Sequence, residues 1–403
     1  MKKIFLSTLA LYAGILSAFS QHSASDSAAY KTRKLKIEEI NFVSGYYHQN
    51  GNHSAVTGGI GTEKLTDFAN TIDLKVSRYD SRLRKHSFDF ELGIDHYSSA
   101  SSDKIDPATI SSASMSDTRI YPSAAWSLQN EQKGNTVGLN ASFSNEFDYK
   151  SVGVGTQFTK TSRDKNREFT TKLQAYLDQW SVIYPVELRT GLSGGGRQGH
   201  SGISGTSPRN SYSASFTFSQ VISKNLQVLF TTEPTYQQGL LATKYQRVYF
   251  SNGTEQAETL PVQRFKIPLG IRANYFVGDR LIIRSFYRYY QDNWGLKAHT
   301  AELETAVKLS PFFSVSPFYR FYAQNQVDYF APYAGHAITD TYFTSDYDLS
   351  RFTSNYVGAN VRIVPVQGIL GIHHFSSAEI RFGHYIRSNG LHANQLSLHL
   401  QLK

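Results

Sequence analysis

The chain contains no cysteine, and it has only 11 prolines, two methionines and three tryptophans among 403 residues. Without cysteine there is no disulfide framework, zinc ribbon, iron–sulfur cluster, thiol nucleophile or lipid anchor on an amino-terminal cysteine. No long run of basic residues concentrates the formal net charge of +9, as a nucleic-acid groove would. Nucleic acid is therefore not expected among the partners.

After residue 20 the sequence also lacks an apolar run of the ~20 residues that a transmembrane helix needs. Before that point, Met1-Lys2-Lys3 is a short basic start, residues 4–19 are almost wholly apolar or small, and Ala18-Phe19-Ser20 places small residues before a cleavage position. This pattern predicts a secretory signal peptide over residues 1–20. A membrane-anchoring helix is the alternative, but the apolar run is short for a span.

Aromatic residues, by contrast, are abundant, with 26 tyrosines and 26 phenylalanines. This content argues against a disordered chain, which would be too polar to collapse. From about Leu35 onward, apolar and polar residues alternate with the period of two that is typical of strands. The alternation is clearest in Val137–Ser144, Tyr212–Ser219 and Leu396–Leu402.

The polar face of these strands distinguishes a membrane barrel from a soluble sandwich. In Phe88–Asp95, three carboxylates lie on the face opposite four large apolar side chains. Strands of 9 to 11 residues with one apolar and one polar face are the signature of outer-membrane barrels. A soluble sandwich is the alternative, but it requires neither this length nor such long loops.

The fold class predicted is all-β: a transmembrane, antiparallel, up-and-down barrel of about sixteen strands. If one hairpin is divided wrongly in this prediction, the number of strands is 14 or 18. Short turns alternate with long loops at 48–65, 98–118, 180–210, 236–262 and 326–353, which we expect to be extracellular. The predicted strands are 36–47, 66–78, 85–97, 119–129, 135–145, 149–159, 168–179, 211–221, 225–235, 263–276, 279–291, 298–309, 312–325, 354–364, 375–387 and 393–402. The expected organisation is a signal peptide (1–20), a periplasmic tail (21–34) and one barrel domain (35–403).

Aromatic residues gather near the predicted strand ends, where amphipathic rings prefer the level of the lipid headgroups. The core of a soluble sandwich is the alternative place for them. These residues are Tyr46, Tyr47, Tyr97, Tyr121, Trp126, Trp180, Tyr275, Phe276, Tyr289, Tyr290, Trp294, Phe312 and Phe313.

The third predicted strand and its outgoing loop carry the most distinctive segments, Asp95–Asp106, Ser111–Ser114 and Ser116–Pro122, and Tyr287–Gly295 and His299–Glu302 follow further on. Over most of the mature chain, the sequence resembles an uncharacterised outer-membrane family catalogued as domain of unknown function 3570. The resemblance implies a barrel and an outer-membrane location. It implies no activity, because the family has none assigned.

The inward positions of the predicted strands carry charge of opposite sign in different parts of the chain. Those on the first three strands are acidic and include Glu39, and those on the tenth to fifteenth strands are mostly basic, with Glu379 among them. The predicted lumen-lining residues are Asp89, Glu91, Asp95, Arg272, Arg284, Arg288, Glu302, Glu304, Lys308, Arg320, Arg362 and Arg381.

Two interpretations of these charges remain open. Acids on one wall and bases on another would set a transverse field across a water-filled pore, as in a diffusion channel for small polar solutes or ions. Alternatively, the charges pair with one another and stiffen a closed or plugged lumen, because a wide barrel keeps a channel only when loops or tails do not fill it.

A possible cation site lies in the loop after the third strand. Asp95, Asp103, Asp106 and Asp117 follow one another along this loop, which also contains two Ser-Ser-Ala-Ser copies, and such hard oxygen ligands suit calcium better than zinc. The spacing is not that of an EF-hand. A loop whose short polar side chains cap its own turns is the alternative. No cofactor other than calcium is expected.

Two histidine motifs remain. His200-Ser201 lies in a glycine-rich loop, and adjacent residues on an extended chain point apart, so a nucleophile–base pair is not indicated. His373-His374 is better suited to an interface or a turn than to one shared metal. No enzyme is therefore expected.

The sequence thus predicts a porin-like pore with a charged lumen in the bacterial outer membrane of a Gram-negative cell. A plugged structural, assembly or partner-binding barrel is the alternative. The expected partners are outer-membrane lipid and lipopolysaccharide, the barrel-insertion machinery and other outer-membrane or periplasmic proteins.

Overall fold

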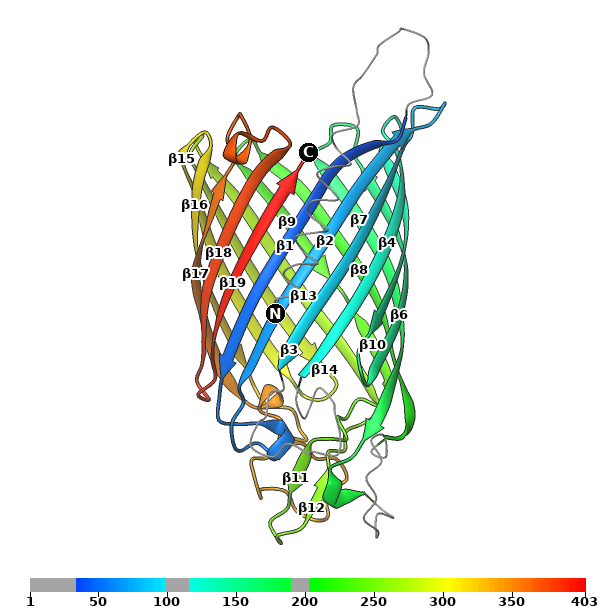
Figure 1. Cartoon of the computed structure of the whole chain (residues 1–403), viewed down its shortest axis with the longest axis vertical. Helices are drawn as coiled ribbons and strands as arrows, with labels where there is room; N and C mark the ends of the chain where they lie inside the picture. Colours follow the sequence, from blue (N-terminus) through cyan, green and yellow to red (C-terminus); the bar gives the residue numbers. More distant parts are fainter. Residues whose placement is uncertain (1–33, 99–115, 190–202) are drawn as a thin grey trace. The chain divides into compact units, whose positions relative to one another are not determined.

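A computed structural model of the chain describes residues 34–98, 116–189 and 203–403. The unit Leu35–Lys403 is built on one antiparallel sheet, in which the first strand pairs with both the second strand and the last (Figure 1). The sheet therefore closes into a barrel. No helix in the described part of the chain is long and apolar enough to cross a membrane. The predicted signal peptide lies outside the described residues.

The barrel strands follow one another around the ring in chain order. They are β1 (Lys36–Asn50), β2 (Leu65–Tyr79), β3 (Lys85–Ser98), β4 (Ser116–Asn130), β5 (Asn135–Asn145), β6 (Tyr149–Thr161), β7 (Arg167–Ile183), β8 (Ile203–Ser223), β9 (Leu226–Thr232), β10 (Thr235–Gly239), β13 (Gln263–Val277), β14 (Leu281–Asp292), β15 (Lys297–Ser310), β16 (Phe313–Gln324), β17 (Phe352–Ile363), β18 (Phe375–Arg387) and β19 (His392–Leu402).

β9 and β10 are two halves of a single strand. Both pair with β8 on one side and β13 on the other, and the register of Thr232 with Phe216 continues unchanged in the pairing of Thr235 with Ser213. Pro234, which lies between the halves, has no amide hydrogen to donate to a ladder. The seventeen strands thus occupy sixteen positions, and the predicted closed antiparallel barrel of sixteen strands is confirmed.

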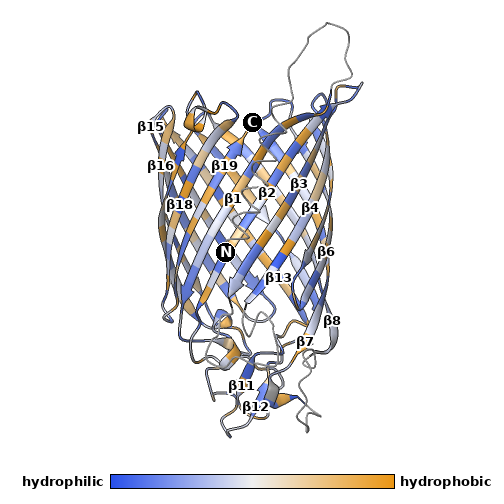
Figure 2. Ribbon diagram, in the orientation of Figure 1, coloured by the Kyte–Doolittle hydropathy of each residue, from blue (hydrophilic) through white to orange (hydrophobic). Residues whose placement is uncertain are grey.

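Closure and side-chain alternation together give the barrel the properties of a membrane protein. The β1–β19 ladder leaves the sheet without an edge, so its backbone groups are paired within the wall, as a lipid environment requires. On β3, Phe90, Leu92 and Ile94 remain 47%, 42% and 41% exposed, whereas Glu91 and Asp95 point to the other face. Figure 2 shows the same alternation of apolar and polar positions along the strands. An apolar outer surface of this kind is suited to lipid.

The β7–β8 hairpin is longer than the sequence predicts. A loop was expected over 180–210, but β7 continues to Ile183 and β8 begins at Ile203, with Trp180 paired to Ser207. The added part of β8 is rich in serine, glycine and threonine and therefore shows no apolar alternation. Similarly, β4 begins at Ser116, inside the loop predicted over 98–118.

The predicted aromatic band is correct only in part. Tyr46 and Tyr275 are exposed on the outer face. Tyr121 instead points inward, where its hydroxyl donates to Asp95 at 2.8 Å. Trp294 is only 2% exposed and belongs to a hydrophobic cluster outside the barrel wall. Strand-end position alone does not reveal which face a ring takes, and for Trp294 the prediction is wrong.

The connections differ at the two ends of the barrel. Six of those at one end are short turns, and the seventh, 364–374, includes the 3₁₀ turn η4 (Ile369–Gly371). At the other end, the long connections carry the 3₁₀ turns η1 (Ala55–Thr57), η2 (Val186–Leu188) and η3 (Tyr347–Leu349) and a hairpin of β11 (Arg247–Tyr249) and β12 (Glu255–Ala257).

Three of these long connections, 51–64, 240–262 and 325–351, pack together, and we call them the cap. The cap contacts Trp294 and Leu296 of the β14–β15 connection through a cluster that includes Leu241, Leu260 and Val327. The hydrophobic clusters in the described residues lie here rather than inside the barrel, whose inner face is mainly polar.

Candidate functional site

One ion pair identifies the inner face of the barrel. Arg381 on β18 lies with its Nη1 atom 3.3 Å from Oε2 of Glu304 on β15, although β16 and β17 separate these strands in the wall. Two side chains can bridge that separation only on the concave side of the sheet. Positions in register with Arg381 and Glu304 therefore face the lumen.

Three of the acidic residues predicted to line the lumen, Asp89, Glu91 and Asp95, lie on the inner face of β3. Lys75 on β2 is paired in register with Asp89, Asp73 is paired with Glu91, and Ala69 with Asp95. Together with the inner faces of β1 and β2, these positions form what we call the acidic wall. It also contains Glu39, which accepts a hydrogen bond from Gln401 at 2.8 Å.

The predicted basic residues lie on the inner faces of β13 to β18, which we call the basic wall. The register places Arg272 opposite Phe286, Glu302 opposite Arg320, and Arg362 opposite Glu379. The inward positions of this wall include Arg272, Arg284, Arg288, Glu302, Glu304, Lys308, Arg320, Arg362 and Arg381.

Much of the basic wall is paired within itself. Arg284 lies 2.5 Å from Glu304, which Arg381 also contacts, and Arg320 lies 2.6 Å from Glu302. Arg362 lies 3.8 Å from Glu379. The predicted interpretation that these charges pair with one another thus describes part of the wall.

Other lumen charges have no such partner. Among the described residues, no carboxylate lies at ion-pair distance from Arg288 or Lys308, and the Glu91 side chain has neither a hydrogen-bond nor an ion-pair partner. The guanidinium of Arg272 lies 5.3 Å from the centre of the Phe286 ring. An unpaired charge away from water is very costly, and the side chains of Arg288, Lys308 and Glu91 are all exposed.

Some strands of the acidic wall lie across the barrel from strands of the basic wall, whereas others are nearly adjacent to them. β2 and β13 occupy opposite positions in the ring, which places Asp73 and Arg272 on opposite sides of the lumen. Elsewhere only β19 separates β1 from β18. The acidic and basic walls therefore face each other across the barrel at β2 and β13 and lie close together on either side of β19.

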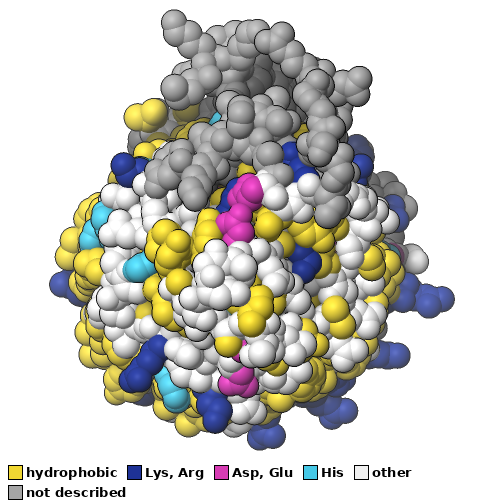
Figure 3. Space-filling view, turned by 90° about the horizontal axis from the view of Figure 1, so that it is seen from below, with side chains coloured by type: hydrophobic (Ala, Val, Ile, Leu, Met, Phe, Trp, Pro, Cys, Tyr) yellow, Lys and Arg dark blue, Asp and Glu magenta, His cyan; other side chains and the backbone are white. Residues whose placement is uncertain are grey.

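An ion pair and a hydrogen bond connect the cap to the barrel. Arg387 on β18 lies 2.5 Å from Asp348 of the cap, and Gln324 at the end of β16 donates to the carbonyl of Ser350 at 2.6 Å. Within the cap, Arg247 donates to the carbonyl of Val56 at 2.9 Å. These contacts join segments far apart in the sequence. Figure 3 views this end of the barrel and shows the side chains of the described residues packed against one another.

The cap also buries carboxyl groups. Glu258 is 2% exposed and accepts hydrogen bonds from the Thr243 amide at 2.6 Å and the Thr344 hydroxyl at 2.5 Å. Burial raises the pKa of Glu258 to about 7. Burial, with the Asp348 carboxylate adding to it, also raises the pKa of Glu63 to about 7 and raises that of Asp346.

Sequence reasoning missed the cap residues entirely. The available signal was the apolar content of the loop predicted over 236–262, where Leu240, Leu241, Val248 and Phe250 are unusual for a solvated loop. Val248 and Phe250 form a second buried cluster with Phe343.

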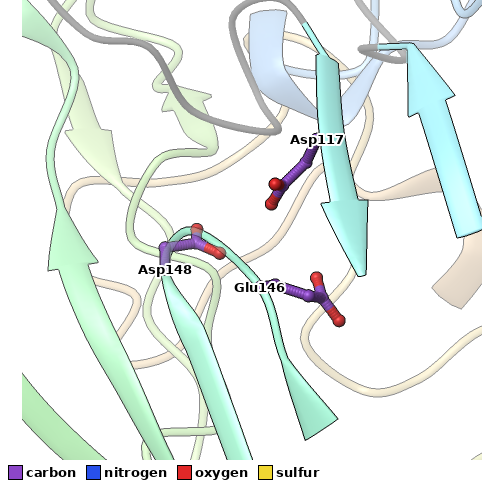
Figure 4. A group of neighbouring side chains, drawn as sticks. All are labelled: Asp117, Glu146 and Asp148. Carbon is purple, nitrogen blue, oxygen red and sulfur yellow. The ribbon is translucent and has the colours of Figure 1, made fainter. Parts of the chain in front are cut away.

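An acidic group lies where β4 begins and β5 connects to β6. Asp117, Glu146 and Asp148 present oxygen atoms that all lie within 4.8 Å of one another (Figure 4). These carboxylates have protein partners: Asp117 accepts from the Phe147 amide at 3.1 Å, and Glu146 accepts from the Tyr97 hydroxyl at 2.7 Å. Burial raises the pKa of Asp148 to about 6.

The cation site predicted from the sequence therefore remains untested. Asp103 and Asp106 lie outside the described residues, so only Asp117 of that set can be placed, beside Glu146 and Asp148. Calcium stays a prediction. His200 and Ser201 also lie outside the described residues. His374 is in the 364–374 connection, with Nδ1 3.0 Å from the Lys403 carbonyl, which agrees with a turn role.

Comparisons with known proteins agree with the predicted family. No curated protein matches the chain. Among solved structures, the chain is similar to OccD3 (OpdP) of Pseudomonas aeruginosa, with 7% identity, coverage of 91% of each chain and a TM-score of 0.43. It is also similar to a BenF-like porin of Pseudomonas fluorescens Pf-5, with 8% identity, coverage of 91% of this chain and 98% of that one, and a TM-score of 0.43.

A bacterial polysaccharide outer membrane secretin is similar as well, with 10% identity, coverage of 91% and 98% and a TM-score of 0.44. A family profile described as "Protein of unknown function (DUF3570)" matches residues 95–376, which is well over half of the chain. The closed barrel, its charged inner face and this match give one conclusion: the chain belongs to the family of proteins of unknown function DUF3570.

Proposed function

We propose that the protein is an outer-membrane channel, a porin-like barrel whose charged lumen passes small polar solutes or ions. The observation that carries this proposal is that charges of both signs on the inner face, of which Arg288 and Glu91 are examples, have no ion-pair partner among the described residues. A dry, filled barrel would leave such groups both buried and uncompensated. A water-filled lumen hydrates them and lets them act on passing ions.

The location belongs to the same proposal. An apolar outer face over a fully paired wall supports insertion in a bilayer, and the signal peptide predicted over residues 1–20 supports export. The expected partners are then the lipid and lipopolysaccharide around the barrel and the machinery that inserts it. Fractionation of membranes on a density gradient should recover the protein with the outer membrane. Recovery in the soluble fraction would contradict this location.

The cap favours a second candidate, a plugged barrel with a structural or partner-binding role. Its hydrophobic cluster around Trp294 and its contacts with the barrel rim are those of a folded element rather than of a loose loop. If the cap never leaves the mouth, the lumen does not conduct. The two candidates therefore differ in one measurable property, the ion conductance.

Planar-bilayer recording of the purified protein tests the proposal. We expect stepwise conductance from the unmodified protein, and longer or more frequent openings when Arg387→Ala and Asp348→Ala remove the ion pair between cap and barrel. Heat-modifiable gel mobility and a β-type circular dichroism spectrum control for folding. If neither the unmodified protein nor the variant conducts ions, although both are folded and inserted, the channel is excluded and the plugged barrel is favoured.

A further inference from the structure

A cavity of about 570 Å³ lies inside the barrel, directly under the cap. Its wall is formed by the inner faces of β1 and β14 to β19, and Asp348 of the cap also lines it. The volume is in the range of ordinary small-molecule sites, which are ~300–1,000 Å³. A solute moving through the barrel would meet this chamber immediately inside the cap.

The charged groups of the cavity leave one cation uncompensated. Arg320 is paired with Glu302 at 2.6 Å, and Arg387 with Asp348 at 2.5 Å. Arg288, which also lines the cavity, is exposed there and has no carboxylate at ion-pair distance among the described residues. Its neighbour in register is Thr300, whose side chain is neutral.

The rest of the wall is aromatic and held in place. The Tyr356 and Tyr385 rings meet edge to face with centroids 6.3 Å apart, and both line the cavity. The Tyr356 hydroxyl donates to Gln395 at 3.0 Å, and the Tyr385 hydroxyl accepts from Arg387 at 2.9 Å. Rings fixed by their hydroxyl groups present their faces and edges to a ligand at little entropic cost.

We propose that this cavity binds a small organic carboxylate with a planar, unsaturated body. The two oxygens of a carboxylate match the parallel donors of a guanidinium, and no carboxylate in the described part of the chain occupies those of Arg288. The planar body packs against the aromatic wall, while Thr300 and Gln395 supply neutral polar contacts. The inference rests on the proposed channel for its physiological meaning, because it names the solute class that the lumen would select.

Benzoate is a suitable probe, with benzamide as its neutral analogue and acetate as an analogue without the ring. Folded protein in detergent micelles is titrated with each compound by saturation-transfer difference NMR. We expect saturable binding of benzoate, and binding of benzamide and acetate weaker by about tenfold or more, as expected when a hydrogen-bonded charge or the packed ring is lost. Equal binding of benzoate and benzamide, or no binding of benzoate, would overturn the proposal.

Two variants localise the site. Arg288→Gln should weaken benzoate binding by about tenfold or more. The matched control is Arg362→Gln, which removes the same charge from the inner face at a residue that is paired with Glu379 and does not line the cavity. The control should leave benzoate affinity within about twofold. Equal losses in both variants would indicate only a general effect of lumen charge, and the site would be rejected.

Conductance separates this inference from the proposed function. If the protein conducts potassium chloride but does not bind benzoate, the channel stands and the carboxylate site fails. If it binds benzoate through Arg288 but never conducts, the site stands and the channel fails. Because the comparison of benzoate with benzamide uses the unmodified protein, the test does not depend on the folding of a variant.

Discussion

Two glycines shape the inner wall beside the cavity. Gly358 on β17 and Gly383 on β18 are directly paired, and both face the lumen. A Cβ atom on Gly383 would lie 2.4 Å from the Tyr356 hydroxyl, and one on Gly358 would lie 2.6 Å from the Phe318 ring. The absence of side chains thus lets these two rings lie against the wall, where Arg381 stacks over Phe318 at 4.0 Å.

Replacing Gly383 by valine should therefore displace the Tyr356 ring into the cavity. We expect the free energy of unfolding to fall by about 1–3 kcal/mol, as is usual for overpacking, and benzoate affinity to fall with it. Urea unfolding of the folded barrel in lipid vesicles, followed by circular dichroism, measures the first effect. Gly45→Ala is the control, because its new Cβ atom would meet Ala69 at an ordinary distance of 3.9 Å. If both variants unfold at the same urea concentration, the ring does not depend on Gly383.

At the scale of an element, the β2–β3 turn combines a strong contact with a strained residue. Asp80 accepts hydrogen bonds from the amides of Arg82 and Arg84, each at 2.9 Å. Although desolvation opposes it, hydrogen bonding from the backbone and side chain of Arg84 lowers the pKa of Asp80 to about 2. Leu83, which follows Arg82, adopts a left-handed backbone conformation with φ of 59°.

Leu83→Asn should stabilise the turn. A left-handed conformation costs an ordinary residue ~1–2 kcal/mol, and asparagine tolerates it better, so we expect a gain of about 0.5–1 kcal/mol in the free energy of unfolding. Urea titration of the variant in lipid vesicles measures it. Arg82→Asn is the matched control, because Arg82 is not among the positive-φ residues. A gain of the same size in the control would show that the backbone of Leu83 is not its cause.

The strands could be predicted because their signal is local. An alternation of period two identifies both a strand and the face of each residue, so the inward positions of Asp89 and Arg381 follow from their neighbours in sequence. Their partners do not: Arg381 and Glu304 meet only because the barrel closes. The strand portion added at Ile203 carries no alternation, and only the pairing with β8 and β13 shows that the strand continues past Pro234 to Gly239.

The cap could not be predicted for a related reason. Its contacts join Arg247 to Val56 and Thr344 to Glu258, residues that lie far apart in the chain and share no local period. A long loop has no repeating pattern that would reveal which side chains it buries. Likewise, that no described carboxylate lies within ion-pair distance of Arg288 depends on where each of these carboxylates lies, which only the assembled barrel specifies.

At the scale of the whole molecule, the cap over the barrel mouth contains three acid groups whose pKa is raised. Glu63 and Glu258 come from different connections of the cap, and burial raises the pKa of each to about 7. Asp346, whose pKa burial also raises, stands two residues before Asp348, the partner of Arg387 on the barrel. Ionisation of these groups would place several negative charges within the packed cap, which would weaken its hold on the barrel mouth.

The cap should therefore loosen as pH rises. An acid whose pKa is higher in the folded cap than its ordinary value of 4.5 binds its proton more tightly there, so it stabilises the cap fully below about pH 4.5 and loses this contribution as pH rises through about 7. For Glu258 the loss is roughly 3 kcal/mol. We expect the open probability in planar bilayers to increase between pH 5 and pH 8.

Glu258→Gln tests the origin of that pH dependence, because glutamine is neutral at every pH and its oxygen can still accept from the Thr243 amide. The variant should behave like the unmodified protein near pH 4.5 but keep a more closed, more protease-resistant cap at pH 8. The control is Glu255→Gln. Glu255 lies in β12, close to Glu258 in the chain, and is only partly buried, so this variant should retain the full pH dependence. A cap that opens on acidification, or a Glu258→Gln variant with an unchanged pH profile, would show that these buried carboxyl groups do not control the mouth of the barrel.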